Sequence, residues 1–289
     1  MFKRAAAAIL AVSVLAFAGC ETKNVSSEEE STVEFDFTNQ PSEVESRNVS
    51  VITAETPSSE PEKKAVSDES DTESKSEFVR RTIEGEPIDT AWFDDCVFIG
   101  DSVTNGLGLY NDYMDLLGNA QFITGASLGY TNCQWDLFDE NAVHPFYNGS
   151  YVLLEDAAEI TGANKVIIGM GMNDIGIYGV DGSIESVEEF IGKLTAKSPG
   201  VEIYFLSVTP MIASAEYDRL NNTKIRDFDD KLEAFANANG YRYLDTWSAV
   251  VDDNGMLPDE LCEDPNDLGL HLNNEGCDIV IDYILRNVG

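Results

Sequence analysis

The chain has 289 residues, of which 53 are acidic and 18 are Lys or Arg, so its formal net charge at pH 7 is −35. A charge of this sign and size argues against binding to nucleic acid or to an anionic lipid surface. The sequence contains five cysteines in no Cys-x-x-Cys pair and only two histidines, so it supports no zinc site, and we expect no metal.

The first 19 residues have the layout of a secretory signal peptide. Two basic residues precede a mostly apolar run that is shorter than the roughly 20 residues of a membrane-spanning helix. The run ends in Phe17-Ala18-Gly19-Cys20, which resembles the lipobox of bacterial lipoproteins, although Phe17 stands where Leu or Val is usual. We therefore predict a signal peptide over residues 1–19 and a lipid on Cys20; an ordinary signal peptide, with Cys20 incidental, is the alternative.

Residues 20–83 are rich in Glu, Asp, Ser, Thr and Pro and poor in large apolar side chains. Such a segment cannot bury enough apolar surface to offset the entropy it would lose on ordering. We predict that it is a disordered, self-repelling acidic linker. The remaining residues, 84–289, have the length and the apolar content of a single folded domain.

Short apolar runs predict five strands, over residues 96–100, 121–124, 165–170, 201–208 and 241–245. Apolar residues recur at helical spacing over 184–196, 222–239 and 278–288. Strands that alternate with helices indicate a three-layer α/β/α sandwich with a mainly parallel five-stranded sheet. In such a sheet a ligand site is expected at the carboxyl ends of the strands.

Three polar clusters fall at those positions. Ser102 follows the first strand and would stand at a helix start, where backbone N–H groups stabilise negative charge. Asn173 follows the third strand, and a side-chain amide there could donate a hydrogen bond to an oxyanion. His271 precedes the last helix, and histidine is the usual base for a serine hydroxyl. Each residue alone could be an ordinary cap or turn residue. The evidence for a catalytic site is therefore that all three clusters occur in this order along one α/β domain.

In this order the clusters resemble those of the SGNH hydrolases, also called GDSL esterases, from about Trp92 to Gly289. FIGDSVTNG is similar to the family's nucleophile block, GMND to its GxND block, and DLGLHLNNEG to its terminal Asp–His block. The resemblance implies a flavodoxin-like fold, with Ser102 as nucleophile and His271 as general base. It also implies that Asp267 orients the histidine.

The same resemblance implies an oxyanion hole formed by the amides of Ser102 and Gly129 and by the side chain of Asn173. The segment from Thr124 to Thr131 is similar to the family's glycine block. Within it, Gly125 is the second candidate for the amide donor, after Gly129.

The terminal block departs from the DxxH spacing that is usual in the family. Asp267 lies four residues before His271, and Leu268 occupies the expected place. Either the loop carries one additional residue, which a positive φ at Gly269 would allow, or Asp264 or water orients the imidazole instead.

The resemblance implies a serine esterase for small-acyl or carbohydrate esters that needs no metal or organic cofactor. For an exported protein tethered to the membrane by a lipid, we expect extracytoplasmic removal of O-acetyl groups from cell-wall or other glycans. Two alternatives stay open: an O-acyltransferase that uses the same residues, and a non-catalytic glycan-binding lipoprotein that has kept the fold.

Overall fold

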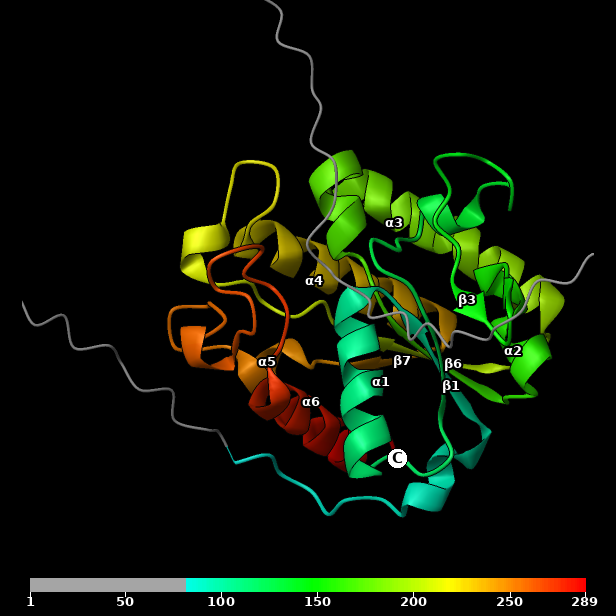
Figure 1. Cartoon of the computed structure of the whole chain (residues 1–289), viewed down its shortest axis with the longest axis horizontal. Helices are drawn as coiled ribbons and strands as arrows, with labels where there is room; N and C mark the ends of the chain where they lie inside the picture. Colours follow the sequence, from blue (N-terminus) through cyan, green and yellow to red (C-terminus); the bar gives the residue numbers. More distant parts are fainter. Residues whose placement is uncertain (1–81) are drawn as a thin grey trace, which may run out of the picture. The chain divides into compact units, whose positions relative to one another are not determined.

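The computed structural model describes residues 82–289. The predictions for the signal peptide, for Cys20 and for nearly all of the linker lie outside the described residues. Within them, a five-stranded sheet is covered by helices on both faces (Figure 1), which is the predicted three-layer α/β/α architecture.

The main sheet contains β1 (Cys96–Gly100), β2 (Gln121–Thr124), β5 (Lys165–Gly169), β6 (Glu202–Leu206) and β7 (Arg242–Leu244). Their order in the sheet is β2-β1-β5-β6-β7, and every neighbouring pair is parallel. Counted along the chain, the main strands are ordered 2-1-3-4-5, as in flavodoxin. The central strand β1 is buried along its whole length, which explains its unbroken apolar sequence.

The helices are α1 (Ser102–Met114), α2 (Ala157–Thr161), α3 (Met172–Lys197), α4 (Asn222–Asn239), α5 (Trp247–Val250) and α6 (Asn274–Asn287). Alternate side chains of β1 point to opposite faces of the sheet. Val97 and Ile99 belong to a core shared with α2, α3 and α4. Cys96 and Phe98 belong to a second core shared with α1, α5 and α6 (Figure 1).

Two predicted helices differ at their starts from those in the structure. α6 begins at Asn274 rather than Asp278, because the Asn273 side chain accepts hydrogen bonds from two amides of the first turn. α3 begins at Met172 rather than near Ile184, and it continues across a kink at Gly179, where φ is 72° and ψ is 174°. The glycines of this first half interrupt the apolar periodicity, which hid it from the sequence analysis.

A short antiparallel hairpin, β3 (Phe146–Tyr147) and β4 (Ser150–Tyr151), lies between β2 and α2 and was not predicted. Its turn is Asn148-Gly149, both with positive φ, which is the common sequence of a two-residue hairpin turn. The remaining elements are the 3₁₀ helices η1 (Thr90–Asp95), η2 (Asn132–Gln134), η3 (Leu154–Asp156), η4 (Ala213–Ala215) and η5 (Asp259–Leu261).

Among residues 82–289 no helix is both long and apolar enough to span a bilayer. Four cysteines of this part are buried and free: Cys96, Cys133, Cys262 and Cys277.

Candidate active site

The nucleophile candidate stands on the first turn of α1, directly after β1. Asp101 is the N-cap of this helix, and its Oδ1 accepts a hydrogen bond from the Val103 amide at 3.0 Å. Because the aspartate supplies the cap, the hydroxyl of Ser102 is not used for capping. It lies 2.9 Å from Nε2 of His271, a distance at which it can donate its proton to the ring.

The strand ends that carry the site approach each other closely. A Cβ atom at Gly100 would overlap the carbonyl oxygen of Gly169, so only glycine fits at the end of β1. The hydroxyl of Thr104 donates to that same carbonyl oxygen. This contact holds the start of α1 against the end of β5 and thereby fixes the position of Ser102.

The other ring nitrogen of the histidine contacts an aspartate. His271 Nδ1 lies 2.7 Å from Oδ2 of Asp264, and Oδ1 of Asp264 accepts from the amides of Leu270 and His271, each at 3.1 Å. Burial raises the pKa of Asp264, but the hydrogen bonds from His271 outweigh it and leave the pKa below its usual value. The group is therefore a carboxylate at neutral pH, it accepts from Nδ1, and Nε2 is left to accept from Ser102.

The prediction that Asp267 orients His271 is wrong. Asp267 is exposed, and its backbone amide donates to the carbonyl of Asp264. Gly269 has a positive φ of 66°, which would also allow an additional residue in the loop, but its amide donates to the Asp264 carbonyl. The bend at Gly269 therefore closes the loop onto Asp264, the alternative residue that the sequence offered for orienting the imidazole. An Asp-Pro pair at 264–265 is a turn signal that favours this reading.

Asn173 and the glycine block are tied together on the other side of the site. The side-chain Nδ2 of Asn173 donates to the carbonyl of Leu128 at 3.0 Å. Asp174, which is 2% exposed, accepts from the amides of Tyr130 and Thr131 at 2.8 and 2.9 Å. A Cβ atom at Gly129 would lie 2.6 Å from the Asp174 carboxylate, so this close approach requires glycine.

Both glycine amides that were candidates for an oxyanion hole have partners within the protein. The N–H of Gly129 donates to Oδ1 of Asn132 at 2.9 Å, and the N–H of Gly125 donates to the carbonyl of Gly100 at 3.1 Å. The contact with Asn132 was not predicted from the sequence. Gly129 can bind an oxyanion only if the Asn132 side chain turns away from it.

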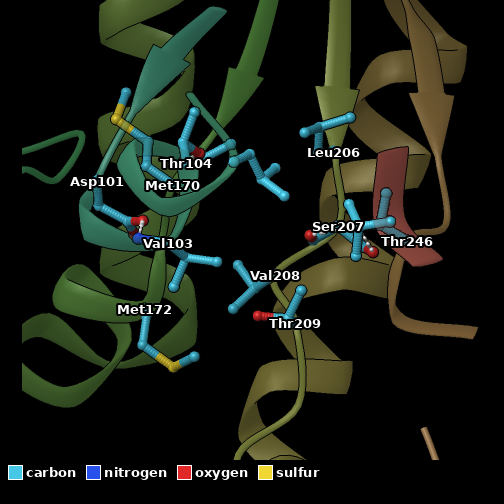
Figure 2. A pocket seen from close by; sticks show the side chains of 13 residues that line it. Asp101, Val103, Thr104, Met170, Met172, Leu206, Ser207, Val208, Thr209 and Thr246 are labelled. Carbon is cyan, nitrogen blue, oxygen red and sulfur yellow. Dashed lines mark hydrogen bonds between the residues drawn. The ribbon is translucent and has the colours of Figure 1, made fainter. Parts of the chain in front are cut away.

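A cavity of about 30 Å³ lies between the end of β6 and the segment that carries Ser102. Figure 2 shows Asp101, Met170 and Met172 on one side of it, and Ser207, Val208 and Thr209 on the other. The volume suits one or two water molecules. Asp101 is 3% exposed, and burial raises its pKa to about 7.

This raised pKa leads to a prediction about stability. Between about pH 4 and 7 the unfolded chain loses the Asp101 proton before the folded protein does, so the free energy of unfolding falls as pH rises. The slope from this group is at most about 1.4 kcal/mol per pH unit. Asp101→Asn keeps an oxygen that can accept from the Val103 amide, and it should remove this contribution to the pH dependence of the free energy of unfolding. Urea unfolding of both proteins at several pH values checks it, and parallel pH curves would contradict it.

Comparisons with known proteins identify the family of this chain. Residues 98–279, more than half of the chain, match the model of the GDSL-like lipase/acylhydrolase family. Comparison with curated protein sequences gives no significant match.

Among solved structures, the chain is similar to a Streptococcus pneumonia protein provisionally assigned as a platelet activating factor. The TM-score is 0.50 at 20% identity, covering 66% of this chain and 81% of the other. A GDSL-like lipase from Bacteroides thetaiotaomicron gives 0.48 at 17% identity, covering 66% and 86%. At 20% identity, the likeness to the first of these structures concerns the fold alone. The family match shows that the chain belongs to the GDSL-like lipase/acylhydrolase family and is a carboxylic ester hydrolase.

Proposed function

We propose that this protein is an extracytoplasmic serine esterase that removes small acyl groups, in the first place O-acetyl groups, from carbohydrate or cell-wall glycans. The observation that carries the proposal is the continuous contact from Ser102 Oγ to His271 Nε2 at 2.9 Å and from His271 Nδ1 to Asp264 Oδ2 at 2.7 Å. This is the arrangement that activates a serine hydroxyl.

In the proposed reaction, the Ser102 oxygen attacks the ester carbonyl while His271 Nε2 accepts its proton. The Asp264 carboxylate stabilises the imidazolium that forms, and the imidazolium then protonates the leaving alcohol. Water, deprotonated by the same nitrogen, releases the acyl group from Ser102. The Ser102 amide and the Asn173 side chain bind the oxyanion, together with the Gly129 amide once Asn132 has released it.

Glycan substrates are favoured by charge and by exposed aromatic side chains. A net charge of −35 disfavours strongly anionic substrates and is compatible with neutral sugars. Phe138 is 92% exposed, and Phe146 and Tyr151 on the β3–β4 hairpin are each more than 60% exposed. They lie on the segment that follows the carboxyl end of β2, and aromatic faces of this kind can stack on sugar rings. Tyr130, another aromatic residue of this segment, is fully buried instead.

The location of the enzyme is part of the proposal. The apolar start of the chain and the Phe17-Ala18-Gly19-Cys20 sequence support export and a lipid on Cys20. The acidic linker would then place the hydrolase domain at a distance from the membrane surface. An enzyme held in this way would meet polymers of the cell wall or of the surroundings.

Two assays test the function. The first measures release of acetate from a chromogenic acetyl ester. The second incubates the protein with a panel of acetylated glycans, with and without a free sugar acceptor, and follows the products by mass spectrometry. We expect acetate release with water as the acceptor. Transfer of the acetyl group to the added sugar would favour the acyltransferase instead, and glycan binding without turnover would favour the non-catalytic alternative.

A further inference from the structure

A buried thiol contacts the aspartate of the proposed triad. Cys262 follows η5, is 6% exposed, and forms an isolated antiparallel bridge with Leu272, the residue after His271. Its Sγ donates to Oδ1 of Asp264 at 3.3 Å. The bridge between Cys262 and Leu272 joins the two ends of the loop that carries both Asp264 and His271, and the thiol contact ties one of these ends to Asp264.

The protonation state of this cysteine fits a donor. Burial raises the pKa of Cys262 to about 12, so the group is a neutral thiol at the pH at which esterases work. A neutral thiol donates a weak hydrogen bond to a carboxylate, whereas a thiolate would repel it. The thiol bond also helps to keep the pKa of Asp264 low, in addition to the stronger bonds from His271.

The hydrogen bonds of Asp264 divide between its two oxygens. Oδ1 accepts from the Leu270 and His271 amides and from the Cys262 thiol, and Oδ2 faces His271 Nδ1. Three donors on Oδ1 fix the rotation of the carboxylate about its terminal torsion, which is otherwise broad and two-fold. Among the contacts described for Oδ1, the thiol is the side-chain donor and the other two are backbone amides.

We infer that Cys262 is a positioning residue of the hydrolytic site, whose thiol holds the Asp264 carboxylate so that Oδ2 faces the imidazole. The inference rests on the proposed function of the Ser102–His271–Asp264 triad. It assigns to the cysteine an effect on the orientation of Asp264 and His271 and no contact with substrate.

The test compares Cys262→Ala and Cys262→Ser with the wild-type protein. Alanine removes the donor, and we expect kcat for an acetyl ester to fall about 3- to 10-fold with KM unchanged, the range for one hydrogen bond. Without the thiol the carboxylate becomes more basic, so the acidic limb of the kcat/KM profile should shift to higher pH. Serine restores a donor and should bring kcat and the profile most of the way back.

Cys277→Ala is the matched control. Cys277 is a thiol of the same core, 3% exposed, whose Sγ lies 3.8 Å from the carbonyl of Leu272. Replacing Cys277 by alanine should lower the unfolding temperature, as replacing Cys262 does. It should leave the pH profile of kcat/KM unchanged. If Cys262→Ala and Cys277→Ala have the same profile as the wild type, or if serine fails to restore what alanine loses, the inference is overturned.

A direct observation of His271 separates this inference from the proposed function. The chain has only two histidines, so the ring signals of His271 can be assigned in an NMR spectrum by comparison with His271→Ala. The inference predicts a different signal for the His271 Nδ1 proton, which faces Asp264 Oδ2, in Cys262→Ala than in Cys262→Ser, whether or not the protein turns over an ester. Identical signals in the two variants would refute it. An unchanged activity in His271→Ala would refute the proposed triad instead.

Discussion

Replacing Ser102 by alanine should abolish ester hydrolysis and leave the fold intact. Loss of the nucleophile of a catalytic triad costs on the order of a millionfold in turnover. The helix start does not depend on this side chain, because the cap is Asp101 and the close packing belongs to Gly100 and Thr104. Turnover of the purified variant on a chromogenic acetyl ester, with circular dichroism to confirm folding, measures both effects.

Ser150→Ala serves as the matched control for this variant. Ser150 is an exposed serine on β4 of the hairpin, and we expect its replacement to leave turnover at the wild-type level. A Ser102→Ala protein with wild-type turnover would show that another group is the nucleophile, and the mechanism proposed here would have to be abandoned.

The positions of the main strands and of the dyad followed from local sequence patterns. β1 and β2 coincide with their predicted limits because each is a short apolar run that stops at a turn. In a parallel sheet those stops meet at one edge. Ser102 stands at that edge after β1 and His271 stands before α6, and the two come together although they are 169 residues apart in the chain.

The identity of the orienting acid could not be predicted in the same way. Asp264 contacts His271, which lies seven positions later in the chain. The loop between them takes its course from the positive φ of Gly269 and from the close packing of Gly269 on Ile212 and Ala215. These contacts come from the β6–α4 connection, which no local spacing encodes. The family's usual spacing therefore favoured Asp267, which is nearer to His271 in the sequence. The tertiary packing of the loop instead brings Asp264 to the imidazole.

The hydrogen bond between Asn132 and Gly129 escaped the sequence analysis for a related reason. The side chain of Asn132, the first residue of η2, accepts from the amide of Gly129 three residues earlier, a local side-chain-to-backbone hydrogen bond of the kind that asparagine forms readily. From sequence alone, the same asparagine reads as an ordinary loop residue. In the proposed mechanism, an oxyanion would have to replace Asn132 Oδ1 as the acceptor for the Gly129 amide.

Asp264→Asn and Asp267→Asn should differ by several orders of magnitude in turnover. Asparagine at 264 removes the negative charge beside the imidazolium and can turn its amide toward Nδ1, which favours the wrong tautomer of His271. In the well-studied serine protease triad that change costs about 10⁴ in turnover, and we expect a loss of similar order here.

Asp267→Asn should stay within about threefold of the wild type, because that side chain is exposed and has no part in the contact with His271. The two variants have the same chemical change in the same loop, so each controls for the other. Turnover of both variants on an acetyl ester, measured beside that of His271→Ala, shows which aspartate orients the imidazole. If Asp267→Asn were the impaired variant and Asp264→Asn active, the loop in solution would present the other aspartate to the imidazole. If both were active while His271→Ala was inactive, the enzyme would work as a Ser–His dyad, and the short contact at Asp264 would serve only to hold the loop.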